Sequence, residues 1–315
     1  MKITLLDAKT LGDDLSFDIL SSFGEVVVFD NTTPEEVENH VSDSDVLVVN
    51  KIKLGAQNLS RAYNLKLICI AATGYDNVDL EYCKENKIAV CNVVGYSTHS
   101  VAQVTLSMAL SLATHIPEYT DFVNSGKYTE SKTANRLVPV YHELYGKTWG
   151  VIGLGNIGKQ VARVAESMGC KVIAFKKTPD SLYDCRSLEY IFKNADIISV
   201  HLPLSSETRG IIDEKLIFSM KENAIFINVA RGAVCDENAL AEAIKQNKIA
   251  GLGIDVYSYE PFDEKHPYNS LLGMPNVCLT PHMAWGAYES RKRCLDEIAQ
   301  NIQSFLDGDF KNRLV

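Results

Sequence analysis

The sequence has no C-x-x-C pair, although it contains eight cysteines. Closely spaced cysteine pairs are typical of zinc sites and redox motifs, so neither is expected, and no metal is implied. Several of the cysteines, among them Cys69, Cys91 and Cys278, lie inside apolar runs that resemble strands. We therefore expect reduced thiols, as is usual in a cytoplasmic protein.

Long apolar runs and an excess of positive charge are also missing. No run reaches the roughly 18 apolar residues that a membrane-spanning helix needs. The apolar part of residues 1–7 is too short for a signal peptide. With a net charge of −9, the chain shows no basic footprint for nucleic acid or for anionic membranes. We expect no nucleic-acid partner, no membrane partner and a cytoplasmic location.

A glycine-rich motif in the middle of the chain carries the strongest signal. An apolar run ends at Ile152 and leads into Gly153, Gly155 and Gly158, in the pattern G-x-G-x-x-G. The segment that follows has helical apolar spacing, and Lys171–Phe175 is a second apolar run. In such a β-α-β unit the first glycine permits a tight turn and the second lets the backbone approach a pyrophosphate. The third lets the helix pack closely on the strand. The helix N-terminus attracts phosphates, so the motif predicts dinucleotide binding rather than a plain glycine-rich turn.

Before this motif, short apolar runs alternate with helical patterns, which indicates a parallel sheet covered by helices. The expected strands are Ile3–Leu6, Val26–Phe29, Val46–Val49, Leu67–Ile70 and Ile88–Cys91. Residues 71–79 lie just past a strand end, where open α/β sheets bind ligands. The alternative for this segment is a turn followed by a helix whose N-cap is Asp79.

The alternation continues to the end of the chain. We expect a helix from Val101 to about Thr114, a break near Pro117 and a connection over residues 124–147. The expected later strands are Ile197–His201, Ala224–Asn228, Ile249–Ile254 and Val277–Leu279. The expected later helices are Leu188–Lys193, Glu214–Met220, Glu237–Gln246 and a long amphipathic one from Ala287 to Leu306.

Three polar residues follow strands in this second part of the chain. They are Arg231, Glu260, which precedes a proline, and His282. A substrate beside a bound nicotinamide lies at the carboxyl ends of such strands. Taken singly, a helix-capping arginine, an exposed carboxylate and a surface histidine remain open alternatives.

The sequence resembles the D-isomer-specific 2-hydroxyacid dehydrogenases over nearly its whole length. Besides the glycine motif, the resemblance rests on the segments Ala72–Gly74, Ser100–Gln103, Val200–Leu204, Glu207–Gly210, Ala230–Gly232, Glu260–Pro261 and Thr280–His282. Within the family, the segment His282–Trp285 looks most like the glycerate dehydrogenase branch, which includes hydroxypyruvate and glyoxylate reductases.

The resemblance implies an α/β fold of two Rossmann-like, doubly wound parallel-sheet domains, with the active site in the cleft between them. A flavodoxin-like substrate-binding (lid) domain would comprise residues 1–98 plus 287–315. The dinucleotide-binding Rossmann domain would comprise residues 99–286. A homodimer is expected, because the helix that begins at Val101 usually takes part in a two-fold dimer in this family.

The resemblance also implies the catalytic roles. Arg231 would bind the carboxylate and carbonyl of a 2-keto acid, for which its planar fork is well suited. His282 would donate a proton to the carbonyl oxygen as hydride arrives. Glu260 would hold the other imidazole nitrogen and fix the tautomer. The resemblance further assigns to substrate binding Lys51, Thr73, Gly74, Tyr75, Arg231, His282 and Trp285. It assigns to cofactor binding Gly153, Gly155, Asn156, Ile157, Gly158, Lys176, Lys177, His201, Pro203, Thr208, Val229, Ala230, Asp255, His282 and Ala284.

The end of the second strand of the nucleotide unit bears on the choice of coenzyme. Sites that select NAD usually have an acid there for the ribose 2′-hydroxyl. Here Phe175 is followed by Lys176, Lys177 and Thr178, which favours NADP(H) within an NAD(P) site. Two solvated lysines on a loop are the alternative.

We therefore expect reversible, NAD(P)H-dependent reduction of a small 2-keto acid, hydroxypyruvate or glyoxylate, to the D-2-hydroxy acid. One alternative is the same chemistry on a bulkier 2-keto acid, decided by the side chains that line the pocket, with Leu54 a further candidate. Another is a nucleotide-sensing, non-catalytic binding protein of the same fold.

Overall fold

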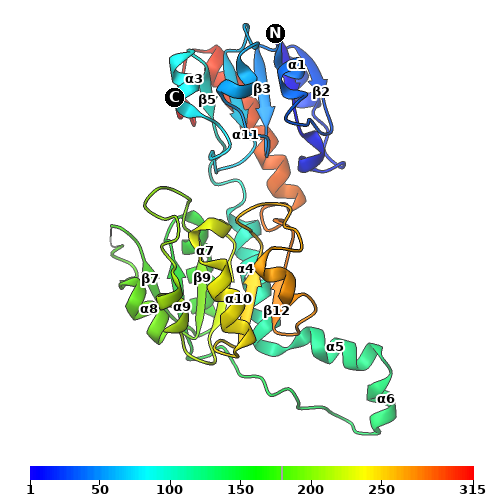
Figure 1. Cartoon of the computed structure of the whole chain (residues 1–315), viewed down its shortest axis with the longest axis vertical. Helices are drawn as coiled ribbons and strands as arrows, with labels where there is room; N and C mark the ends of the chain where they lie inside the picture. Colours follow the sequence, from blue (N-terminus) through cyan, green and yellow to red (C-terminus); the bar gives the residue numbers. More distant parts are fainter. Residues whose placement is uncertain (179) are drawn as a thin grey trace. The chain divides into compact units, whose positions relative to one another are not determined.

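The computed structural model describes residues 1–178 and 180–315. Its contacts divide the chain into two compact units. Unit 1 consists of Met1–Ser97 and Gly286–Val315, and unit 2 of Thr98–Trp285. Each unit has a parallel sheet with helices against it (Figure 1), so the prediction of two parallel-sheet α/β domains is confirmed.

Unit 1 is built on five parallel strands in the order β2-β1-β3-β4-β5, which is the flavodoxin-like order. The strands are β1 Lys2–Leu5, β2 Glu25–Val28, β3 Val46–Val49, β4 Leu67–Ile70 and β5 Ala89–Cys91. The helices are α1 Val37–Val41, α2 Ala56–Leu59, α3 Leu80–Glu85 and α11 Tyr288–Leu306, with 3₁₀ turns at Ala8–Leu11 and Asp18–Phe23. Every residue of β3 and β4 is buried, as expected for central strands covered on both faces.

Unit 2 is built on seven parallel strands in the order β12-β11-β10-β9-β6-β7-β8. The strands are β6 Thr148–Ile152, β7 Lys171–Phe175, β8 Asp184–Cys185, β9 Ile197–Val200, β10 Ile225–Asn228, β11 Gly251–Ile254 and β12 Val277–Leu279. The helices are α4 Thr98–Thr114, α5 Ile116–Asn124, α6 Lys127–Ser131, α7 Asn156–Ser167, α8 Leu188–Asn194, α9 Glu214–Phe218 and α10 Glu237–Lys245, with 3₁₀ turns η3 Gly232–Val234 and η4 Pro267–Leu271. The strand order reverses between β6 and β9, which marks the crevice where a doubly wound sheet binds its dinucleotide.

The connection before the nucleotide strand is more structured than expected. The break near Pro117 is present, because His115 has a φ of +54° between α4 and α5. The predicted connection over residues 124–147 contains a short helix, α6, that was not expected, and the two-residue β8 was not expected either. Elements this short show too little periodicity to be recognised from sequence.

The composition predicts reduced thiols and no membrane-spanning helix. Among the described residues, all eight cysteines are free thiols, and six of them are buried. Burial raises the pKa of Cys69, so this thiol stays protonated at neutral pH. Across the described parts of the chain, no helix is long and apolar enough to cross a membrane.

Candidate active site

The glycine turn has the geometry that a dinucleotide site requires. Gly153 has a φ of +98°, and a Cβ there would lie 2.8 Å from the carbonyl carbon of His201. A Cβ on Gly158 would lie 2.0 Å from the carbonyl oxygen of Gly153, so only glycine lets α7 pack this closely. A Cβ on Gly155, by contrast, would meet no atom within 4 Å. The backbone at Gly155 is therefore open to an approaching group, and these residues fit a dinucleotide phosphate at the start of α7.

His201 follows β9 and lies against this turn. The Trp149 indole N–H donates to Ser199 Oγ at 2.9 Å, and Ser199 Oγ lies 3.0 Å from His201 Nε2. Burial lowers the pKa of His201 to about 3, so the ring is neutral. Among the described residues, its Nδ1 is the one buried side-chain nitrogen or oxygen atom without a hydrogen-bond partner. A buried nitrogen without a hydrogen-bond partner beside the glycine turn is consistent with the prediction that His201 contributes to the cofactor site.

The remaining residues assigned to the cofactor lie along the same edge of the sheet. Asn156 and Ile157 form the first turn of α7. Thr208 Oγ1 donates to the Pro203 carbonyl at 2.6 Å and closes the loop after β9. The other members are buried directly after β10 or after β12, namely Val229, Ala230 and Ala284.

The loop after β10 places Arg231 at the carboxyl end of the sheet. Asn228, the last residue of the strand, clamps this loop: its Oδ1 accepts the Ala230 N–H at 3.0 Å and its Nδ2 donates to the Arg231 carbonyl at 3.0 Å. The guanidinium donates to the Ala230 carbonyl at 2.8 Å through Nη1. Asn228 is only 1% exposed, so its amide fixes the backbone from which Arg231 projects.

The loop after β12 holds His282 in an unusual backbone conformation. The φ of His282 is +51°, which is uncommon for a residue with a side chain. Asp255, at the end of β11, holds both sides of this turn. Its carboxylate accepts the Thr280 hydroxyl at 2.6 Å and the N–H groups of Met283 and Ala284 at 2.9 Å each. Burial raises the pKa of Asp255, while these three hydrogen bonds oppose the shift.

Glu260 and His282 form the pair that the resemblance predicts. His282 Nδ1 lies 2.6 Å from Glu260 Oε2, and both side chains are partly exposed. The other carboxylate oxygen, Oε1, accepts the N–H of Tyr257 at 3.1 Å. The carboxylate thus favours one tautomer and one orientation of the imidazole, with Nδ1 facing Glu260.

The end of β7 carries a carboxylate that the sequence interpretation missed. Lys176 Nζ lies 3.5 Å from Asp180 Oδ2, and Lys159 Nζ of α7 lies 2.8 Å from the same atom. The Lys159 ammonium lowers the pKa of Asp180 to about 2, so Asp180 is ionised at neutral pH. Lys177 forms an exposed ion pair with Glu207 at 2.8 Å. The two lysines therefore do not stand alone at this strand end, since each has an acidic partner.

The predicted substrate residues of unit 1 also follow strand ends of their own sheet. Lys51 follows β3, and its N–H donates to Asp7 Oδ2 at 2.6 Å. Thr73 follows β4 and donates through Oγ1 to the Val93 carbonyl at 2.7 Å. Tyr75, two residues on, is 46% exposed. The helix N-cap considered for this segment is present as well, because Asp79 accepts the N–H of Tyr82 at 3.0 Å.

Trp285, in unit 2, is also predicted to bind substrate. Its ring packs, partly buried, against the apolar cluster between α4, α7 and the sheet.

Arg231, Asp255 and His282 follow β10, β11 and β12, which are adjacent strands. The structure therefore gathers the predicted catalytic residues at one edge of a single sheet.

Known proteins resemble this chain throughout its length. The family model described as the D-isomer specific 2-hydroxyacid dehydrogenase, NAD binding domain, matches residues 106–284. A hydroxypyruvate reductase of Blautia hydrogenotrophica is 34% identical, with 98% of each chain covered. A glycerate dehydrogenase of Methylorubrum extorquens is 33% identical over 99% of this chain and 98% of its own.

A solved structure agrees with these matches. An acyclic imino acid reductase in complex with NADPH and D-Arg superposes with a TM-score of 0.89, at 30% identity and full coverage of both chains. From the fold, the glycine turn, the family match and these relatives, the chain belongs to the D-isomer-specific 2-hydroxyacid dehydrogenases, an oxidoreductase family with a nicotinamide cofactor.

Proposed function

We propose that this protein reduces a small 2-keto acid, hydroxypyruvate or glyoxylate, to the D-2-hydroxy acid in a reversible, NAD(P)H-dependent reaction. The observation that carries the proposal is the Glu260–His282 pair at 2.6 Å, on a turn that Asp255 holds. The names of the relatives, hydroxypyruvate reductase and glycerate dehydrogenase, support the choice of substrate.

The residues divide the reaction between them. A nicotinamide cofactor held at the glycine turn of Gly153, Gly155 and Gly158 would supply the hydride for the carbonyl carbon. Arg231 binds the carboxylate and polarises the carbonyl through its planar fork. Protonated His282 gives its Nε2 proton to the carbonyl oxygen, which completes the hydroxyl group and leaves a neutral imidazole that solvent reprotonates. Glu260 stabilises the imidazolium before transfer. In the oxidative direction the same imidazole accepts the proton.

Unit 1 also carries residues that are predicted to bind substrate. We assign Lys51 and the loop that carries Thr73, Gly74 and Tyr75 to substrate binding, because they follow the carboxyl ends of β3 and β4. Polar backbone and side-chain groups at such ends suit a small carboxylate.

The test is a panel of 2-keto acids with NADH and NADPH, followed at the nicotinamide absorbance. Hydroxypyruvate or glyoxylate should give the highest kcat/KM. A preference for branched or aromatic 2-keto acids would favour the bulkier-substrate alternative. Cofactor binding without any turnover would favour the nucleotide-sensing protein. An arm with added ammonium tests for imine reduction, which the name of the imino acid reductase raises.

For the coenzyme, we infer a modest preference for NADP(H). Three ammonium groups, those of Lys159, Lys176 and Lys177, face two carboxylates at the end of β7. A 2′-phosphate adds negative charge there, where the balance of these five groups is positive. Because both carboxylates compete for the lysines and salt screens exposed charges, we expect a preference of no more than about tenfold.

Replacing Lys176 by aspartate should lower the ratio of kcat/KM for NADPH to that for NADH by about tenfold, since repulsion replaces attraction. Asp180→Asn should raise the same ratio, because it releases Lys159 and Lys176. Lys171→Asp, at the other end of β7, is the matched control. The measurement is the ratio at low and high salt. If the parent prefers NADH, or if Lys176→Asp leaves the ratio unchanged, these lysines are solvated loop residues that do not select the coenzyme.

Glu260→Gln should move the alkaline limb of keto-acid reduction to lower pH. Reduction needs the imidazolium, and the carboxylate 2.6 Å away stabilises that form, whereas a neutral amide does not. The measurement is kcat/KM against pH, with Glu264→Gln as the control, because Glu264 is exposed in the same loop. An unchanged profile would show that Glu260 does not act through the imidazole.

We also propose that the protein forms a homodimer. In Figure 1, α5 and α6 extend away from the sheet of unit 2. Several apolar side chains of α5 and of the connection after α6 are exposed, namely Ile116, Val123, Leu137, Val138 and Val140. Exposed apolar side chains grouped on one segment are typical of an interface. Light scattering gives the molar mass, and a monomer at micromolar concentration would contradict the proposal.

A further inference from the structure

A buried charged residue, Glu237, lies beneath the proposed catalytic loops. It is the first residue of α10, after the N-cap Asp236, and its side chain is 8% exposed. Its Oε1 accepts the N–H of Ser258 at 2.9 Å, and its Oε2 lies 3.0 Å from His266 Nε2. A carboxylate at this depth needs such partners, and the start of a helix adds favourable dipole.

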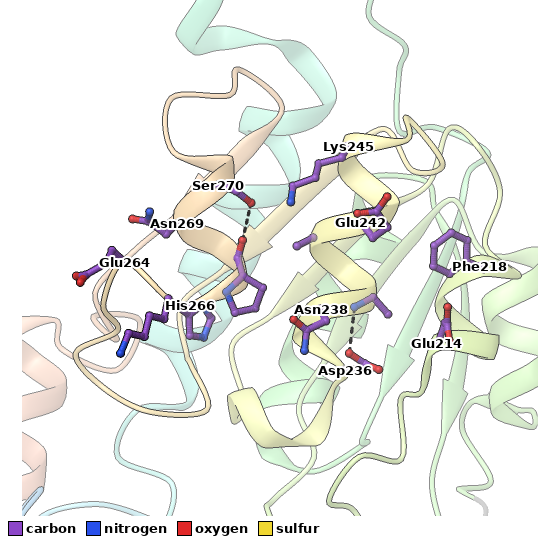
Figure 2. Close-up of a pocket in the computed structure, with 14 residues that line it drawn as sticks. Glu214, Phe218, Asp236, Asn238, Glu242, Lys245, Glu264, His266, Asn269 and Ser270 are labelled. Atoms are coloured by element: carbon purple, nitrogen blue, oxygen red, sulfur yellow. Dashed lines mark hydrogen bonds between the residues drawn. The ribbon is translucent and has the colours of Figure 1, made fainter.

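The histidine partner is held equally firmly. The His266 side chain is fully buried, and its Nδ1 accepts the N–H of Tyr268 at 3.2 Å. Nδ1 is therefore unprotonated, so Nε2 carries the hydrogen and donates it to Glu237. Figure 2 shows His266 among the residues that line a pocket of α9, α10 and η4. The pair thus joins the start of α10 to the end of the loop that carries Glu260.

Contacts lead from this pair to both members of the proposed catalytic pair. The ring of Tyr257 meets that of His266 edge-on, with centroids 5.8 Å apart. The N–H of Tyr257 donates to Glu260, and its hydroxyl donates to the Thr280 carbonyl at 2.9 Å, two residues before His282. One residue thus touches the Glu237–His266 pair, Glu260 and the turn of His282.

The loop that carries Arg231 also contacts the Tyr257–Ser258 peptide. A Cβ on Gly232 would lie 2.1 Å from the carbonyl carbon of Tyr257 and 2.2 Å from the nitrogen of Ser258. The backbone beside Arg231 is therefore in close contact with the peptide that Glu237 holds. A shift of that peptide would move both loops.

We propose that Glu237, with His266, is a positioning residue for the Arg231, Glu260 and His282 loops. Neither side chain touches substrate in this assignment. Both fix the Tyr257–Ser258 peptide, and through it the aim of Glu260 at the imidazole. The inference rests on the proposed function, because it concerns the same catalytic pair.

Glu237→Gln is the direct test. The amide has one acceptor oxygen, so either the Ser258 N–H or the His266 Nε2–H must face a donor. We expect kcat to fall about tenfold, since small displacements of catalytic groups are costly, while the Kd values of NADH and NADPH stay unchanged. Glu214→Gln is the matched control, because Glu214 has the same first position in α9 but is exposed.

A double-mutant cycle separates positioning from stability. In a Glu260→Gln background, Glu237→Gln should lower kcat by no more than about twofold, because the group that it positions is already disabled. An equal loss in both backgrounds, or a lower Tm with kcat unchanged, would overturn the proposal. If Glu237→Gln does not fold, His266→Phe keeps a ring against Tyr257 but removes the donor, and the same cycle applies.

The cycle also distinguishes a failure of the proposed function from a failure of the positioning role of Glu237. A parent without turnover on any 2-keto acid contradicts the proposed function. Glu260→Gln with an unchanged pH profile contradicts the role of Glu260, and with it the positioning role. A parent that behaves as proposed, combined with an additive effect of Glu237→Gln, contradicts only the positioning role.

Discussion

His282→Ala is expected to lower kcat for keto-acid reduction by about 10²–10⁴-fold, the range that general acid catalysis contributes. The imidazole is the proton donor of the proposed reaction, and methyl cannot replace it. The turn itself should survive, because Asp255 holds it through the backbone N–H groups of Met283 and Ala284. The measurement is single-turnover reduction at saturating cofactor, with the Kd of NADPH determined separately by fluorescence.

The control for this variant is His142→Ala, which removes an exposed imidazole from the segment before β6. It should retain the parent rate. A loss of less than about tenfold for His282→Ala in the chemical step would remove His282 from the role of acid. A parallel loss of cofactor affinity would indicate damage to the site rather than loss of the proton donor.

Arg231→Lys is expected to lower kcat/KM on the order of a hundredfold. A guanidinium can give two parallel hydrogen bonds to a planar acid, whereas an ammonium acts as a point charge. Loss of one charge-assisted bond is worth roughly 1.5–3 kcal/mol, which is ten- to hundredfold or slightly more. The loop should keep its path, since Asn228 binds the Arg231 carbonyl and not its side chain.

The effect should appear in KM as well as kcat, because the carboxylate is bound in both the ground state and the transition state. Arg186→Lys is the matched control, in an exposed ion pair with Asp184. Catalytic efficiency near that of the parent would place Arg231 outside the substrate site. A lowered Tm would instead indicate a structural role.

The strands could be predicted because buried parallel strands are continuous apolar runs. Val46–Val49 and Leu67–Ile70, which are buried throughout, are found with the predicted bounds, and so is the partly buried edge strand Val277–Leu279. Helices with a clear apolar face, such as that from Tyr288 to Leu306, could be predicted equally well. The short α6 was missed, because one turn and a half carries no periodicity.

Part of the candidate site could also be predicted. The three glycines have local steric reasons that any dinucleotide turn shares. Arg231, Glu260 and His282 stand at strand ends, where parallel sheets expose polar groups. Their assignment to catalysis rested on the family resemblance and stays a prediction that the variants above test.

The sequence by itself determined the alternation of strands and helices, the glycine turn and the strand ends at which the polar residues stand, because patterns of apolar and small residues follow burial and backbone freedom. The division into two domains came from the family resemblance. Only the tertiary structure decided which polar side chains meet. Asp180 reaches Lys159, and Glu237 reaches His266 across 29 positions, because loops of the right length return there. Asp255 likewise holds a turn whose backbone is 28 positions away. The partner of a buried carboxylate depends on the paths of loops, which no local pattern records, whereas the free energy of an unpaired buried charge makes such partners obligatory once the chain has folded.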